Sequence, residues 1–349
     1  MKFLNSIFSV FLSNKVRTHI AKNQLQLDWI NTLFVLSFLL IGFVGVPLFY
    51  LAGNEIHFGP WALAFGTYWI MGIGITMGYH RLFSHRTYEA ANWVQALLLI
   101  AGSGALQNSA LKWSADHRKH HSFTDTEKDP YNAKLGFLWS HVLWIFFSDP
   151  AEKALRFSGA SNEARLLQQF PQCRDLVKNP LVRLQHRISI PFGILFGFGI
   201  PLAFGIHYNM VLEYVLVAGF LRTTLVHNST FFINSLAHIW GTQPHSDKDT
   251  ARDSVAMAFL ALGEGYHNYH HSFPNDYRNG TQALHFDSTK WLIYGFSKVG
   301  ATWNLKRSNL QKNSADTVSQ ELLNRLSAEK VYSLHPVKDP LDFPSKISV

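Results

Sequence analysis

Histidines gather in four short motifs, and these residues have the clearest capacity for chemistry in the sequence. The chain has 18 histidines in 349 residues, and half of them belong to these motifs. Residues three and four apart share a face of a helix, so each of the two His-x-x-His-His motifs points three imidazoles in one direction. A single histidine on an apolar helix is usually a hydrogen-bonded core residue, but nine buried imidazoles need a shared partner. The nine are His80, His85, His117, His120, His121, His238, His267, His270 and His271, and the amide of Asn234 precedes His238.

This set of ligands predicts two metal ions. Structural zinc takes four ligands, usually with cysteine, whereas nine imidazoles and an amide are too many for one ion. We expect Asn234 to act through a bound water, because a neutral amide oxygen is a weak ligand. On a continued α-helix His80 and His85 would be about 140° apart, so the helix must end or kink there, or the two must serve different ions.

The expected position of the motifs limits the metal and its reaction. A two-metal site at a membrane face, next to an apolar cavity, suits the oxidation of an unactivated hydrocarbon. That reaction needs dioxygen and a redox-active metal, which excludes zinc and favours iron. The predicted cofactor is therefore a pair of iron ions.

Long apolar segments must position these histidines. No Lys or Arg occurs from Trp29 to His80, and this stretch divides at a polar turn after residue 51. A second apolar stretch runs from Ile188 to Phe220 and is interrupted only by Glu213. A helix of about 20 apolar residues crosses the hydrocarbon of a bilayer. We therefore predict two transmembrane hairpins, with spans near 30–51, 58–79, 188–206 and 211–233.

The distribution of charge predicts the orientation and the compartment. The hairpin turns contain no Lys or Arg, so the opposite side is cytoplasmic by the positive-inside rule. The formal net charge of +8 favours membrane lipid or an acidic partner over nucleic acid. The single cysteine, Cys173, excludes an internal disulfide and fits a reducing compartment. We expect a multi-pass protein of a bacterial inner membrane or the endoplasmic reticulum, with both termini and the active site in the cytoplasm.

The chain divides into six segments on this interpretation. Residues 93–106 are apolar but too short for an ordinary crossing, and a crossing there would separate the histidine motifs. We therefore expect an interfacial or half-inserted helix. The segments are an amphipathic N-terminal interfacial segment (1–29), the first hairpin (30–80), a cytoplasmic segment (81–187), the second hairpin (188–233), a cytoplasmic catalytic segment (234–305) and a polar tail (306–349).

The residues around the histidines resemble the membrane-bound fatty acyl desaturases of the stearoyl-CoA (delta-9) type. The likeness covers about 70–300 and includes GITMGYHRLFSHRTY, WSADHRKHHSFTDTEKDPYN, LRTTLVHNSTFFINSLAH and GEGYHNYHHSFPNDY. It implies that the nine histidines are di-iron ligands and that Asn234 holds a water. It also implies the fold, an all-α integral membrane protein with four transmembrane helices under a helical cytoplasmic cap. The implied reaction is the dioxygen-dependent introduction of a cis double bond, at the delta-9 position, into a saturated long-chain acyl thioester or lipid-linked acyl chain.

The resemblance also implies contacts with the acyl chain. The spacing agrees with the expected end of the acyl tunnel: Gly72 lies eight residues before His80, about 12 Å at the helical rise, and shares a helix face with Tyr68. The implied contacts are Gln107, Trp113 and Thr230 at a bend of the chain, Asn108 and Asp116 near the head group, and Tyr68 and Gly72 at the tunnel floor.

The sequence departs from the pattern of this family in two respects, and both concern the partners of the reaction. Basic residues that contact the phosphates of coenzyme A in animal members are replaced by Ala115 and, by approximate alignment, by Ser148 and Asp149. Because phosphate recognition relies on Arg and Lys, the acyl carrier stays open among coenzyme A, acyl carrier protein and lipid. The tail after Arg307 is too short for the haem domain that some relatives carry. We therefore expect a separate electron donor, a ferredoxin, a rubredoxin or a cytochrome.

Two other functions compete with this interpretation. A membrane fatty acyl hydroxylase or alkane monooxygenase of the same histidine-rich superfamily would share the metal chemistry, but the string GEGYHNYHH favours a desaturase. A non-catalytic membrane protein that binds zinc would contain a redox-silent metal and consume no dioxygen.

Overall fold

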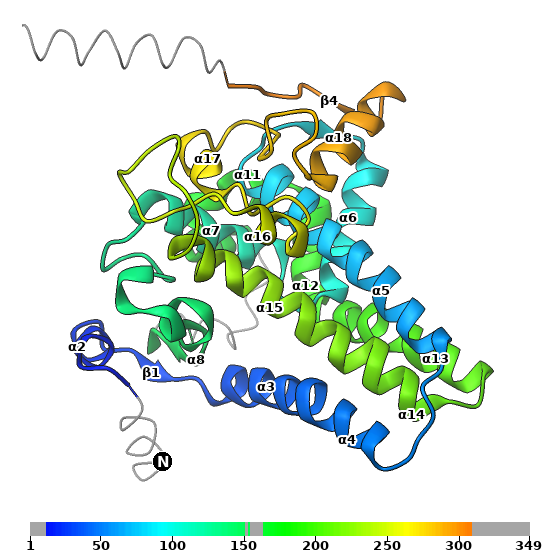
Figure 1. Cartoon of the computed structure of the whole chain (residues 1–349). Coiled ribbons are helices and arrows are strands. Elements are labelled where there is room, and N and C mark those ends of the chain that lie inside the picture. Colours follow the sequence, from blue (N-terminus) through cyan, green and yellow to red (C-terminus); the bar gives the residue numbers. More distant parts are fainter. Residues whose placement is uncertain (1–11, 151–152, 154–162, 309–349) are drawn as a thin grey trace, which may run out of the picture. The chain divides into compact units, whose positions relative to one another are not determined.

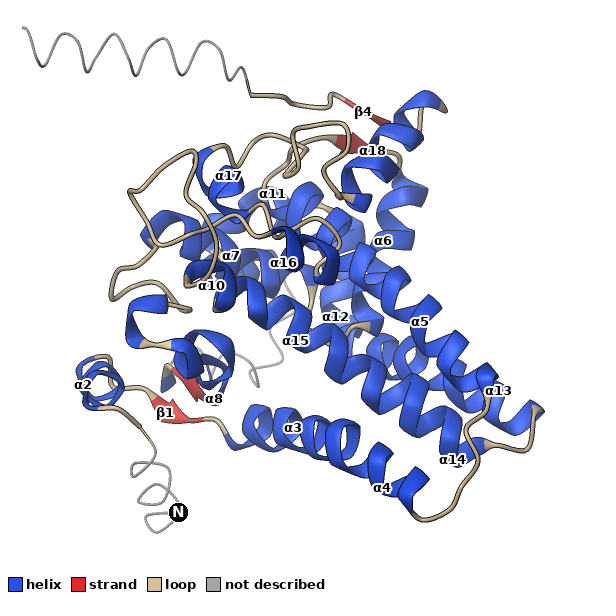
Figure 2. Ribbon diagram, in the orientation of Figure 1, coloured by secondary structure: helices blue, strands red, loops and turns tan. Residues whose placement is uncertain are grey.

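The computed structural model describes residues 12–150, 153 and 163–308, which are mostly helical, with long loops between residues 239 and 287 (Figure 1). Four short strands complete this described part (Figure 2). The prediction of a mainly helical protein is therefore confirmed. Residues 1–11 of the predicted amphipathic segment (1–29) lie outside the described residues, as does most of the polar tail (306–349).

The first two long helices form a hairpin at the positions of the first two predicted spans. The carboxylate of Asp28 accepts a hydrogen bond from the backbone N–H of Asn31, which caps the first helix. The second helix continues past residue 79 into the first histidine motif. The pair consists of α3 (Trp29–Leu40), η1 (Ile41–Gly45) and α4 (Val46–Leu51), followed by α5 (Phe58–Ile73) and η2 (Gly74–Ser84).

The third and fourth long helices form a second hairpin. The third begins at Pro180 rather than near 188, because the side chain of Asn179 accepts hydrogen bonds from the first turn and caps it there. Ile188 departs from helical geometry and marks a kink, three residues before Pro191, which lacks the N–H needed for the helical bond. The segments are α12 (Pro180–Ile194), η6 (Leu195–Gly199) and α13 (Ile200–His207), then α14 (Val211–Tyr214), η7 (Val215–Leu221) and α15 (Arg222–Asn234).

The tips of the two hairpins meet at Glu213. This buried carboxylate accepts hydrogen bonds from the hydroxyl of Tyr50 at 2.9 Å and from the backbone N–H of His57 at 3.1 Å. Figure 1 shows α4, α13 and α14 together at this end, away from α7 and α17. Both hairpin turns therefore lie at the end opposite the histidine motifs.

Two of the long helices are apolar and long enough to cross a membrane. They run over Trp29–Leu51 and Pro180–His207. All four helices also present large apolar side chains on their outer faces, where a soluble protein would place polar groups. Examples are Leu40, Leu48, Phe65, Ile70, Ile190, Ile194, Leu212 and Leu225.

The helix expected at 93–106 is observed as α6 (Asn92–Gly104), which packs along η2. The approach is close: a β-carbon at Gly74 would lie 2.2 Å from the backbone nitrogen of Gly102. A short turn leads to α7 (Ala110–Phe123), where Ser109 caps the helix by accepting a hydrogen bond from the N–H of Lys112.

The cap is built from short helices and loops around α7. Buried apolar side chains of the cap and of α5, η2 and α6 form the largest apolar cluster, which includes Met77, Tyr79, Leu111, Val177 and Ile293. The remaining helices of the cap are η3 (Ala133–Leu135), η4 (Trp139–Leu143), α8 (Trp144–Phe146), α10 (Glu163–Gln169), η5 (Pro171–Cys173), α11 (Arg174–Lys178), η8 (Leu236–His238), α16 (Val255–Leu260), α17 (His267–Ser272) and α18 (Ser288–Lys298).

Two antiparallel strand pairs join segments that are far apart in the sequence. Helix α2 (Asn14–Lys22) leads into β1, which pairs with β3 so that Gln26 lies opposite Ser148. Strand β2 pairs with β4 so that Glu89 lies opposite Trp303. The sequence interpretation did not include these strands, which are β1 (Gln26–Leu27), β2 (Glu89–Ala90), β3 (Phe147–Ser148) and β4 (Thr302–Trp303).

Candidate metal centre

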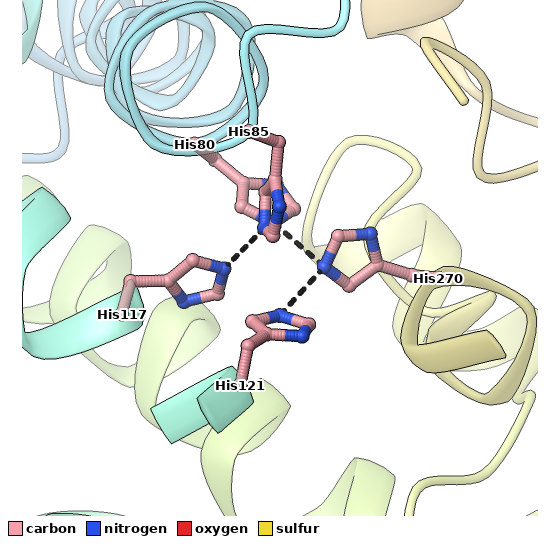
Figure 3. Close-up of side chains that lie close together, drawn as sticks. All are labelled: His80, His85, His117, His121 and His270. Atoms are coloured by element: carbon pink, nitrogen blue, oxygen red, sulfur yellow. Dashed lines mark hydrogen bonds between the residues drawn. The ribbon is translucent and has the colours of Figure 1, made fainter. Parts of the chain in front are cut away.

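The nine predicted ligands come together in two groups of imidazoles. Within each group one ring nitrogen per histidine can be chosen so that all lie within 4.8 Å of one another. Figure 3 shows the larger group, in which imidazoles from three segments point toward one centre. The five-histidine group is His80, His85, His117, His121 and His270, and the four-histidine group is His120, His238, His267 and His271.

Local helix geometry explains how His80 and His85 reach the same group. The segment η2 is π-helical, and the N–H of His85 donates to the carbonyl of His80 at 3.1 Å, five residues back. A π-turn is wider than an α-turn, so residues five apart come close to the same face. The helix also ends here, as one of the predicted alternatives requires, because η2 stops at Ser84 and His85 is its C-cap. The two histidines thus reach one group without a sharp kink.

Helices α7 and α17 each contribute to both groups. In α7, His117 and His121 join the five-histidine group, while His120 joins the other. In α17, His270 joins the five-histidine group, while His267 and His271 join the other. The two motifs thus bring the groups next to each other.

The facing ring nitrogens of the five-histidine group cannot all form hydrogen bonds with one another. The Nε2 atom of His270 lies 3.1 Å from Nε2 of His80 and 3.0 Å from Nε2 of His121. The Nε2 atoms of His85 and His117 are 2.8 Å apart. A neutral imidazole has one N–H, so His270 cannot donate to both neighbours. A cation between these nitrogens would accept all the lone pairs.

The facing ring nitrogens of the four-histidine group cannot all form hydrogen bonds with one another either. The Nε2 atom of His267 lies 3.1 Å from Nε2 of both His238 and His271. The Nε2 atom of His271 also lies 3.3 Å from that of His120. This donor set suits a second cation, because imidazole binds iron, copper, nickel and zinc.

Burial keeps the imidazoles neutral, as metal binding requires. Burial is the largest cause that lowers the pKa of most of these histidines, and the neighbouring imidazoles lower it further. The pKa is lowered for His85, His117, His121, His238, His267, His270 and His271.

Side chains behind the histidines orient their other ring nitrogens. The Nδ1 of His120 is 2.9 Å from a carboxylate oxygen of Asp129. The Nδ1 of His80 is 2.7 Å from a carboxylate oxygen of Glu264, although it is not in line for a hydrogen bond. The Nδ1 of His238 faces the hydroxyl of Thr250 at 2.9 Å. An acceptor at Nδ1 places the proton there and leaves Nε2 free to bind a metal.

The Arg81 guanidinium and neighbouring N–H groups keep these carboxylates ionised. Burial raises the pKa of Glu264, but Arg81 and His80 outweigh it and lower the pKa to about 2. Burial also raises the pKa of Asp129, but His120 and backbone N–H groups lower it overall. Arg81 is itself buried between Glu264 and Asp287, and this ion-pair network joins η2 to the end of the cap.

Two cavities lie beside the histidines. The larger has a volume of about 440 Å³ and the smaller about 50 Å³, and Trp113, Thr230 and Asn234 line both. The smaller cavity also contacts His80 and His117. All the predicted contact residues line one or both cavities: Gln107, Asn108, Trp113, Asp116 and Thr230 the larger, and Tyr68, Gly72, Trp113 and Thr230 the smaller.

The three residues predicted at the bend form one hydrogen-bonded unit between the cavities. The side chain of Gln107 donates to the hydroxyl of Thr230 at 2.9 Å and accepts from the indole N–H of Trp113 at 3.3 Å. The indole stacks on His117, with ring centres 4.9 Å apart. The unit therefore joins the cavity wall directly to the five-histidine group.

Leu262 is a cavity residue that the sequence interpretation missed. It lines the smaller cavity and has a left-handed backbone, with φ of 56°. A β-carbon at Gly72 would lie 2.5 Å from its Cδ1. Next to it, the hydroxyl of Tyr68 donates to the carbonyl of Leu260 at 2.5 Å. The end of the smaller cavity is thus closed by the cap as well as by α5.

The mouth of the larger cavity carries charges of both signs. Lys112 is paired with Asp116 at 2.6 Å, and Ser148 and Asp149 also line this cavity. Ala115 is buried instead, and its carbonyl accepts a hydrogen bond from Gln172. Ala115 therefore lies beneath the chain around η5 and not among the residues that line the cavity.

The sequence of the whole chain was compared with known proteins. The family model described as fatty acid desaturase matches residues 55–286, a range that holds all nine histidines. The chain belongs to the fatty acid desaturase family.

Relatives within the desaturase family cover most of this chain. A probable acyl-CoA desaturase of Schizosaccharomyces pombe is 37% identical over 87% of this chain and 60% of its own length. Acyl-CoA desaturase 1 of Saccharomyces cerevisiae is 36% identical over 85% of this chain and 55% of its own length. A stearoyl-CoA desaturase of Sus scrofa is 33% identical over 81% of this chain and 76% of its own length. The chain thus spans little more than half the length of the two yeast desaturases.

The contact between Asp129 and His120 generates a test of the candidate metal centre. In an Asp129→Asn variant the amide cannot hold the Nδ1 proton of His120 as the carboxylate does. Changes to such outer partners usually lower metal affinity or activity about 10–100-fold. We expect purified Asp129→Asn protein to lose bound metal at chelator concentrations that leave the unchanged protein loaded, as measured by elemental analysis.

Asp276→Asn is the matched control. Asp276 is also a buried carboxylate of the cap, and it accepts hydrogen bonds from Tyr269 and Arg278. The Asp276→Asn protein should retain its metal as the unchanged protein does. Equal retention by both variants would contradict the assigned role of Asp129.

Proposed function

We propose that this protein uses two iron ions and dioxygen to introduce a cis double bond, at the delta-9 position, into a saturated long-chain acyl group. The observation that carries the proposal is that His80 and His117 of the five-histidine group line the smaller cavity together with Trp113, Thr230, Tyr68 and Gly72. Membership of the desaturase family and the names of the relatives support the reaction type.

The nine histidines would hold the two ions, and Asn234 would hold a water next to them. Bound iron supplies the redox chemistry that activates dioxygen. The protein's own residues bind and bend the acyl chain, keep water away from it and keep the imidazoles neutral. The reaction removes two hydrogen atoms from adjacent carbons, and dioxygen leaves as two waters after taking up two further electrons and two protons.

These two electrons must come from another molecule. We propose a separate one-electron donor protein of the ferredoxin, rubredoxin or cytochrome type. For the acyl carrier we propose a thioester of coenzyme A, which the names of the relatives favour. Carrier-protein and lipid esters are the other candidates, because Ser148 and Asp149 line the larger cavity and provide no basic group there.

Fatty acid analysis tests the reaction directly. The chain is expressed in a host that lacks its own desaturase, and the fatty acids are analysed by gas chromatography and mass spectrometry. We expect a cis-monounsaturated product, and none from a His270→Ala variant that accumulates in the membrane. A hydroxylated product would instead support the monooxygenase alternative, and an unchanged lipid profile with a zinc-loaded protein would support the non-catalytic one.

We propose that all four long helices cross the membrane, with both termini and the metal centre in the cytoplasm. The common end of the two hairpin tips and the apolar outer faces support this topology. Cysteines introduced at Asn54 and Tyr208 should then react with an impermeant reagent from outside. A cysteine at Arg174 should react only after the membrane is opened. Labelling of Arg174→Cys in intact cells would contradict the topology.

The closed end of the smaller cavity predicts the preferred chain length. Isoleucine at position 72 would meet Leu262 and shorten the cavity, whereas Leu262→Ala would lengthen it. A methylene-sized change in an apolar pocket changes selectivity about 10–200-fold. We expect Gly72→Ile to favour chains of about sixteen carbons or fewer over eighteen, and Leu262→Ala to favour longer ones, with the double bond in the same place.

Gly66→Ile is the matched control for this prediction. Gly66 is also in α5, but a β-carbon there would meet no atom within 4 Å. Its product profile should match that of the unchanged protein. Active Gly72→Ile and Leu262→Ala proteins with unchanged chain-length profiles would show that the acyl chain ends elsewhere.

A further inference from the structure

The turn between α6 and α7 is held by side chains from another helix. A helix ends with carbonyls that have no partner within it, and buried carbonyls need one. The N–H of Ala105 and that of Leu106 satisfy two of them. The carbonyl of Gly104 accepts from a guanidinium N–H of Arg222 at 3.1 Å, and that of Ala105 accepts from Nε2 of His227 at 2.8 Å.

Arg222 joins three helices at this point. Its side chain is fully buried. Besides Gly104 at the end of α6, it donates to the carbonyl of Gly197 in η6 at 2.6 Å and to that of Ala218 in η7 at 3.1 Å. A planar guanidinium can bridge carbonyls in several directions, which an ammonium group on a flexible stem does not reproduce. Its positive charge also suits the C-terminal end of α6.

The third long helix closes the other side of the turn. A β-carbon at Gly193 would lie 2.3 Å from Cδ2 of Leu106, and one at Gly197 would lie 3.1 Å from the carbonyl oxygen of Gly104. The turn itself has left-handed backbone at Leu106, with φ of 55°, and at Asn108, with φ of 68°. Such conformations persist where the surroundings hold them in place.

This turn carries Gln107, which links Thr230 and Trp113 at the bend. The position of the turn therefore fixes how far the bend lies from the histidines, and so which carbons of an acyl chain face the metals. We propose that Arg222 and His227 are positioning residues that set the location of the double bond. The proposal rests on the proposed desaturase function. Arg222 lines neither cavity, so its effect on the product must act through the turn, whereas His227 also lines the larger cavity. The comparison of His227→Leu with His227→Gln therefore isolates the hydrogen bond to the turn.

Three variants test this role. Arg222→Lys keeps a cation but loses the planar fork, His227→Leu removes the donor to Ala105, and His227→Gln retains an N–H donor. Each is expressed in the desaturase-deficient host, and double-bond positions are determined by mass spectrometry of derivatised products. Arg222→Lys and His227→Leu each lose a buried hydrogen bond, which should shift the turn slightly. We therefore expect the share of double bonds at other positions to rise at least about fivefold in both variants. His227→Gln should keep the original position.

Thr224→Val is the matched control, because Thr224 donates to the carbonyl of Phe38 at 2.8 Å from the same helix but does not contact the turn. It should give the original double-bond position.

The inference is overturned if Arg222→Lys and His227→Leu retain iron and form the original product alone, only in lower yield. If Arg222→Lys does not accumulate, the two His227 variants decide the matter. Absence of any unsaturated product from the unchanged protein would instead refute the proposed function.

Discussion

Nine buried or partly buried imidazoles must present unprotonated nitrogens to two points, and the rest of the structure depends on this constraint. Burial lowers the pKa of most of these histidines and keeps them neutral. Their facing nitrogens are too close for one N–H per ring to satisfy them. Neutral imidazoles whose lone pairs converge on one point bind a transition-metal ion well. The cluster is therefore a candidate metal site, and the smaller cavity lies directly against it.

The remaining elements satisfy this constraint in two ways. The π-helical winding of η2 directs His80 and His85 to one group, and the double use of α7 and α17 brings the two groups together. Behind the rings, Asp129 and Glu264 orient the Nδ1 atoms. Because Arg81 pairs with Glu264 and Asp287, the same ionic network that orients a histidine also joins the cap to the second long helix.

Hydrophobicity predicted the helix α6, and the spacing of the histidines predicted that they gather, as they do in two groups. The residues that line the cavities followed from the family resemblance and not from local patterns. The π-helical geometry of η2 could not be predicted from such patterns, because α-helical periodicity separates His80 and His85 by about 140°. Asp129 and Glu264 lie within the sequence strings that carry the family resemblance, but only the fold shows which ring each one faces. Leu262 could not be found from sequence, because its place opposite Gly72 follows from the packing of the cap. The two-residue strands are too short to give an alternating pattern.

We propose that each imidazole group holds one iron ion. X-ray diffraction from crystals of the purified, unchanged protein, measured just above and just below the iron absorption edge, tests it most directly. The account predicts two anomalous peaks that disappear below the edge, one among His80, His85, His117, His121 and His270 and the other among His120, His238, His267 and His271. A single peak, peaks elsewhere, or a signal that persists below the iron edge would contradict it.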